Sequence, residues 1–113
     1  MIYRLAEPHD WSAAQRQGFF ASPDLAAEGF IHFSERHQVE GVARRYYSGR
    51  AGLILLVVDE TRLGPAAPLK RENTTGGTEL FPHVYGAVPL DAVVQSAPFL
   101  QNADGTIHWT EGI

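Results

Sequence analysis

The sequence contains no cysteine among its 113 residues. This absence excludes a disulfide framework, zinc sites built on thiolates and a cysteine nucleophile. Long apolar runs are also missing: the aliphatic stretch 53–58 is far too short to cross a bilayer, and the first residues lack the pattern of a signal peptide. We therefore expect a cytoplasmic protein with no membrane association.

An excess of positive charge is absent as well. The chain has 9 Lys and Arg against 13 Asp and Glu, for a formal net charge of −4. Such a balance creates no field that would attract nucleic acid. The basic pair Arg44–Arg45 is interpreted as the solvated face of a helix. Duplex DNA is not expected as a partner.

The composition is that of one folded domain. Hydrophobic residues make up 44% of the chain and charged residues 19%, which is close to the average for globular proteins. A chain of this length closes an apolar core without metal or disulfide bonds, and no repeat or linker divides it. We expect a single domain over residues 1–113, as a monomer or small homo-oligomer.

The hydrophobic pattern predicts more strands than helices. Strands are expected over residues 2–5, 30–33, 53–58, 69–72 and 84–85, with a hairpin between 94–100 and 106–110. The run 53–58 is the expected centre of the sheet. Helices are expected over about 10–17, in one turn before Gly29, and over about 35–47 with Ser34 as N-cap. The sequence therefore predicts a compact α+β domain with a split or curved, mostly antiparallel sheet and two or three short helices.

Two pairs of histidine and hydroxyl residues are the best candidates for a site. Alternation along a strand places His32 and Ser34 on one face, opposite Ile31 and Phe33. His83 and Tyr85 share a face in the same way, beside Gly86, which would permit close approach of a ligand. Each pair also has a purely structural interpretation, in which the histidine bonds a carbonyl and the hydroxyl residue caps or packs.

An acidic residue completes the candidate cluster. Glu72 ends the predicted strand 69–72 and is suited to orient a histidine or to stabilise a positive charge. His32, His83 and Glu72 would also suit a divalent metal, although nothing in their spacing singles out that use, and no metal is predicted. No glycine-rich phosphate loop is present.

Taken in order along the chain, these segments resemble the bacterial family called domain of unknown function 952. The resemblance covers almost the whole chain and is specific as an ordered set. It is carried by residues 2–4, Asp24, residues 29–34, 38–39, the aliphatic strand, residues 69–72, and residues 81–86 running into 89–93. Phe33 and the pair Lys70–Arg71 depart from the family pattern.

The resemblance implies a fold like that of the ADP-ribosyltransferases, in which two small sheets form a cleft for NAD. His32 and Ser34 would contact a ribose or phosphate, His83 and Tyr85 would line the opposite wall, and Glu72 would be the acidic partner. The glutamate that these enzymes usually carry near the chain end has no counterpart here, because Glu111 lies in the terminus.

Two hypotheses of function follow. The first is a small transferase-like enzyme acting on NAD or a related nucleotide, with catalytic residues His32, Glu72 and His83 and ligand-binding residues Ser34, Arg71 and Tyr85. The second is a non-catalytic module that binds a small anionic or nucleotide ligand in the same cleft. A third interpretation, an interaction protein with structural histidines, stays open at this point. The first two hypotheses use the same cleft and differ only in whether the bound ligand is converted to a product.

Overall fold

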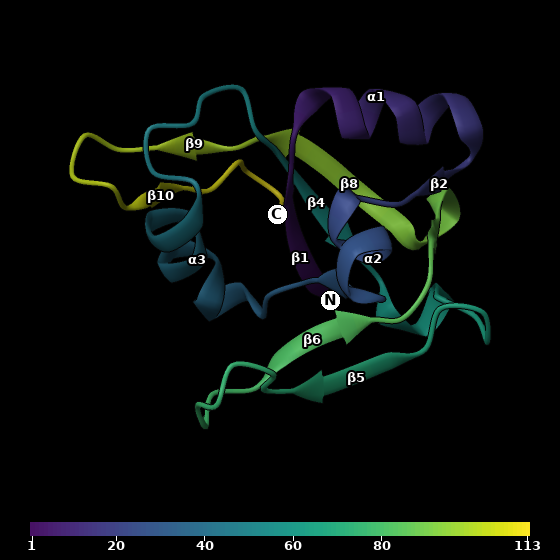
Figure 1. The fold of residues 1–113 in the computed structure, drawn as a ribbon. Helices are drawn as coiled ribbons and strands as arrows, with labels where there is room; N and C mark the ends of the chain where they lie inside the picture. The colour runs from purple at the N-terminus through teal and green to yellow at the C-terminus, as the bar shows by residue number, and fades with distance from the viewer.

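The computed structural model describes all 113 residues and contains two three-stranded antiparallel sheets with short helices packed against them (Figure 1). The first sheet has the order β1 (Ile2–Ala6), β4 (Ile54–Val58), β8 (Val93–Pro98). The second has the order β3 (Ile31–His32), β6 (Phe81–Val84), β5 (Leu69–Glu72). Two small pairs join β2 (Phe19–Phe20) to β7 (Val88–Pro89) and β9 (Leu100–Gln101) to β10 (Ile107–His108). The predicted α+β class with antiparallel pairing is confirmed.

Three α-helices connect the strands: α1 (Pro8–Gln17), α2 (Pro23–Glu28) and α3 (Val39–Tyr46). Single 3₁₀ turns are η1 (Arg36–Gln38), η2 (Glu60–Arg62) and η3 (Leu90–Ala92). Gly18 and Gly29 end α1 and α2 in the left-handed conformation, as predicted, because glycine adopts positive φ without strain. None of the helices is long and apolar enough to span a membrane.

The prediction that Ser34 caps the third helix is wrong. Glu35 is the cap of the η1 turn that leads into α3, where its carboxylate and the side chain of Gln38 form a reciprocal capping box. The Gln38 amide oxygen accepts from the Glu35 amide at 2.9 Å. The Ser34 side chain is therefore not used to begin the helix.

The first sheet is buried on both faces, as the aliphatic run of β4 predicts. Leu56 and Val58 contribute to a core shared with α1 and the second sheet, while Leu55 and Val57 face a second core against α3. In Figure 1, α1 and α2 lie on one side of this sheet, and α3 with the β9–β10 hairpin lies on the other. Alternation along a strand requires apolar residues at every position of β4 when both faces are covered.

Two expected elements differ in extent. Strand β6 begins at Phe81 and so includes Pro82, whose carbonyl accepts from the Phe33 amide at 2.9 Å. Proline argues against a central strand, which is why the sequence predicts a later start. The hairpin around residues 102–105 is formed by β9 and β10 alone, because β8 pairs along β4.

A single pair of residues joins the two sheets by backbone hydrogen bonds. Tyr3 and Ser34 exchange both backbone hydrogen bonds, each of 2.8 Å, between the free edge of β1 and the segment after β3. This junction is the split that the sequence predicts, and it positions the candidate site beside it.

The close approach expected at Gly86 is made by the protein's own backbone. A Cβ atom at this position would overlap the carbonyl oxygen of Ala66. Gly86 therefore allows the loop before β5 to pack against the end of β6, and the expectation of a ligand there is wrong.

Candidate functional site

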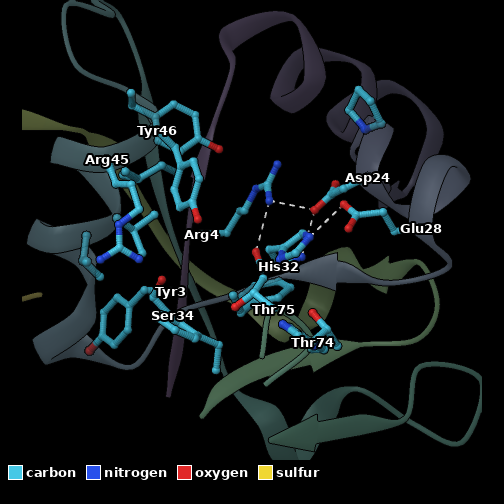
Figure 2. A pocket seen from close by; sticks show the side chains of 18 of the residues that line it. Tyr3, Arg4, Asp24, Glu28, His32, Ser34, Arg45, Tyr46, Thr74 and Thr75 are labelled. Carbon is cyan, nitrogen blue, oxygen red and sulfur yellow. Dashed lines mark hydrogen bonds and ion pairs between the residues drawn. The ribbon is translucent and has the colours of Figure 1, made fainter. Parts of the chain in front are cut away.

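A pocket of about 590 Å³ opens beside the junction of the two sheets. Its walls come from β1, α2, β3, α3, the loop after β5 and β6 (Figure 2). Its lining includes Tyr3, Arg4, Asp24, Glu28, His32, Ser34, Arg45, Tyr46, Glu72, Thr74, Thr75 and His83. The pocket thus brings together four of the six predicted site residues.

Arg4 and Asp24 close the gap where β1 and β3 separate. Nη1 of Arg4 donates to Oδ2 of Asp24 at 2.9 Å and to the carbonyl of His32 at 3.1 Å. The same carboxylate oxygen accepts from the His32 amide at 2.8 Å. The ion pair therefore satisfies both backbone groups of His32, which would otherwise be left unpaired at the split.

The environment of Asp24 favours its ionised form. Burial raises the pKa of this carboxyl, but the Arg4 guanidinium, the His32 amide and the Ser22 hydroxyl together outweigh burial, so the net shift is downward from 3.8. A carboxylate with this many donors stabilises the folded chain only while it stays ionised.

Asp24→Asn is expected to lower the free energy of unfolding at pH 7 by about 1–3 kcal/mol, because it weakens the bonds to Arg4 and His32. The pKa of Asp24 is lower in the folded chain than in the unfolded chain. The stability that ionised Asp24 gives to the fold is therefore fully present above pH 3.8 and is lost as the pH falls through the folded pKa. Wild type should therefore lose more stability than Asp24→Asn between pH 5 and about pH 2–3 in urea unfolding experiments.

The exposed Asp91 supplies the control for this prediction, because it lies outside the pocket and its side chain makes no hydrogen bond. Asp91→Asn should follow the wild-type pH dependence. Parallel loss of stability in wild type and Asp24→Asn would contradict the role given to Asp24.

His32 and His83 form one cross-strand pair. They lie opposite each other in the β3–β6 register, and their ring centroids are 5.1 Å apart. The His83 ring stacks on Phe30 with a centroid distance of 4.2 Å, and it is 3% exposed. The facing walls expected for the two histidines are therefore wrong: directly paired residues of neighbouring strands point to the same face of a sheet. The two residues nevertheless line the same pocket.

Glu72 orients His83. Oε1 of Glu72 lies 3.0 Å from Nδ1 of His83 and also accepts the hydroxyl hydrogen bond of Tyr85. The bonds from Tyr85 and from His83 lower the pKa of Glu72, and the same carboxylate raises the pKa of Tyr85. An ionised carboxylate can only accept, so Nδ1 of His83 carries the proton and Nε2 of the neutral ring keeps its lone pair.

His32 is held at its outer end by a second carboxylate. Nε2 of His32 lies 2.9 Å from Oε2 of Glu28, in an exposed pair between β3 and α2 (Figure 2). Each of the two histidines thus has one carboxylate partner. Ser34 also lines the pocket, is 6% exposed, and its hydroxyl makes no hydrogen bond with the protein.

The other two predicted site residues lie outside the pocket lining. Arg71 points to the opposite face of β5 from Glu72, and its guanidinium binds the carboxylates of Glu35 and Glu60 at 2.9–3.1 Å. Neighbouring residues of a strand face opposite sides, so only one of Arg71 and Glu72 can face the pocket. Tyr85 is connected to the site by its bond to Glu72 and by the packing of its ring against Phe30, with a centroid distance of 5.2 Å. No group of three or more His, Asp or Glu side chains is arranged to hold a metal ion.

Comparisons with known proteins define the family. A family model described as "Protein of unknown function (DUF952)" matches residues 5–96. The chain belongs to this family. The crystal structure of protein CC0527 from Caulobacter crescentus is 36% identical with a TM-score of 0.80, covering 95% of this chain and 92% of that chain. The solution NMR structure of CC0527 is 36% identical with a TM-score of 0.76, covering 94% and 89%. No curated protein matches the chain.

These matches establish the DUF952 family and its fold but assign no activity, because the family is described as one of unknown function. Neither the family nor these structures is described as related to ADP-ribosyltransferases, so that relationship stays a prediction.

Several residues of this DUF952 pocket are not among the predicted site residues. Arg4 is the one charged residue in an otherwise apolar strand, a signal that marks it for a special role. Asp24 follows a proline in the first turn of α2. Acidic residues are common at that position, so nothing in the sequence distinguishes Asp24. Arg45 lines the pocket instead of forming only a solvated face, and Tyr46 follows it. No pattern in the sequence shows which side of α3 meets the pocket.

Proposed function

We propose that the pocket binds NAD or a related nucleotide and that the protein is a transferase-like enzyme. The observation that carries the proposal is the orientation of His83. Its Nδ1 is bonded to Glu72 and its ring is stacked on Phe30, which leaves Nε2 free in a residue that lines the pocket. A nucleophile or base held by an orienting carboxylate is a recurrent feature of catalytic sites.

In this proposal His83 is the general base and Glu72 is its positioning partner. A water or hydroxyl group in the pocket transfers its proton to Nε2 of His83 as its oxygen attacks the ribose carbon. With NAD as substrate, the bond to the nicotinamide nitrogen breaks and its electron pair leaves with nicotinamide. His32 and Ser34 anchor the ribose or phosphate, because their polar atoms share this wall of the pocket.

A non-catalytic nucleotide-binding module is the second candidate, and one observation favours it. The pocket is lined by five carboxylates, and each already has a basic partner in the protein. These contacts leave no carboxylate of the pocket without a partner, as suits a wall that binds a ligand without reacting with it. Release of nicotinamide from NAD, measured by chromatography, separates the two candidates.

Ser34→Ala tests the binding itself. Because the Ser34 hydroxyl has no partner in the protein and does not cap a helix, the variant should unfold at the same urea concentration as wild type. Loss of one hydrogen bond to the ligand should weaken binding of NAD or ADP-ribose by roughly 2- to 10-fold in calorimetry. Ser96→Ala, on an exposed part of β8, is the matched control and should bind as wild type does.

Wild type that binds neither NAD nor ADP-ribose would contradict the proposed function. Equal affinity in Ser34→Ala and wild type would remove Ser34 from the ligand contacts while leaving the pocket in place.

A further inference from the structure

The end of α3 presents an aromatic ring to solvent at the rim of the pocket. Tyr46 is the last residue of α3 and is 64% exposed, although it belongs to the pocket lining. Its ring therefore keeps a large apolar face uncovered beside a cavity. Covering such a face with a planar ligand removes apolar surface from water and allows ring stacking.

A cation accompanies this ring. The guanidinium carbon of Arg45 lies 5.9 Å from the centroid of Tyr46, within cation–π range. The neighbouring Arg44 pairs with Glu40 on the exposed side of α3, whereas Arg45 lines the pocket and forms no ion pair. An aromatic ring together with an arginine suits a nucleobase, which stacks on either group.

The pocket has a different chemistry at its other end. Figure 2 shows Tyr46 and Arg45 on one side, His32 and Glu28 on the other, and Arg4 between them. Both hydrogen bonds of Arg4 to the protein use Nη1, and its Nε is buried without a partner, so Nη2 is the donor that remains for a ligand. From end to end, the pocket offers an aromatic ring, a cation and a histidine pair, which matches the order base, phosphate and ribose of a dinucleotide.

We propose that Tyr46 stacks on the base of the bound nucleotide and that this contact makes the site selective for base-containing ligands. The inference rests on the proposed nucleotide function. It adds a group that recognises the base, which is absent from the end of the pocket formed by His32 and Glu28. Selectivity then comes from α3, while the chemical groups come from the second sheet and α2.

The test compares ligands with and without a base. Affinities of ADP-ribose, AMP and ribose 5-phosphate are measured by calorimetry for wild type, Tyr46→Phe, Tyr46→Leu and the control Phe19→Leu. Phe19 is a similarly exposed aromatic, 40% exposed on β2 and outside the pocket lining. Circular dichroism confirms that each variant is folded, which the exposure of Tyr46 predicts.

Tyr46→Leu should weaken ADP-ribose and AMP roughly 5- to 150-fold, the range for base–aromatic stacking, and leave ribose 5-phosphate within about twofold. Tyr46→Phe and Phe19→Leu should bind as wild type does. Equal weakening of all three ligands by Tyr46→Leu, or no weakening of any, would overturn the stacking role alone. Wild type that binds none of the three would overturn the proposed nucleotide function together with this inference.

Discussion

Ile31→Ala is expected to lower the free energy of unfolding by about 2–5 kcal/mol. The Ile31 side chain is fully buried in the core between the two sheets, and its strand partner is Val84, which is also fully buried. Truncation removes buried methyl groups and leaves a cavity that the paired strands cannot close. Because domains of this size are stable by only about 5–15 kcal/mol, the shift in the urea midpoint should be large.

His32→Gln, one residue further on, should change the free energy of unfolding by less than about 1 kcal/mol. The His32 side chain is 41% exposed, and its contact with Glu28 is an exposed surface pair of small net value. The backbone bonds from Arg4 and to Asp24 do not involve the ring and remain in the variant. If His32→Gln unfolds the protein as strongly as Ile31→Ala, the ring is structural and its role in the site is lost.

His83→Gln is expected to reduce the turnover of NAD by about 10²- to 10⁴-fold, the range for a general base. The affinity for ADP-ribose should change much less, because in the proposed mechanism Nε2 accepts a proton from the attacking group and does not contact the nucleotide. Steady-state rates of nicotinamide release, with calorimetry for binding, check both statements. His108→Gln is the control, since His108 is exposed on β10 and does not line the pocket.

Glu72→Gln extends the same prediction. In the proposed mechanism Glu72 acts through His83, to which it is bonded, so the double variant Glu72→Gln/His83→Gln should be little slower than His83→Gln alone. Multiplicative losses would show that Glu72 has an independent role. Because His83 is buried, thermal unfolding of each variant must accompany the kinetics. Full turnover in a folded His83→Gln variant would refute the assignment of the base.

The Arg4–Asp24 pair explains how the pocket stays open. Two strands that continued to pair beyond Tyr3 and Ser34 would close the gap with a backbone ladder. Instead, side chains from β1 and α2 satisfy the amide and carbonyl of His32. The sheets can therefore separate at this point without leaving buried backbone groups unpaired, and the cavity forms in the separation.

Local patterns account for most of the secondary structure that could be predicted. The apolar residues of β1, the aliphatic run of β4, and the glycines after α1 and α2 each act over a few residues. Their physical causes are side-chain periodicity and the positive φ that glycine allows. The start of β6 escaped prediction because Pro82 opposes local strand propensity, and pairing with β5 and β3 overrides it.

The sequence alone determined the class of the fold, the split sheet, and the histidines, serine and glutamate that share the pocket. Only the tertiary structure decided that His32 and His83 occupy the same wall, that Glu72 faces the pocket while Arg71 faces Glu35 and Glu60, and that α3 adds Tyr46. The reason is physical: periodicity along one strand or helix tells which residues share a face. Strand order and packing, which depend on contacts distant in sequence, decide what that face meets.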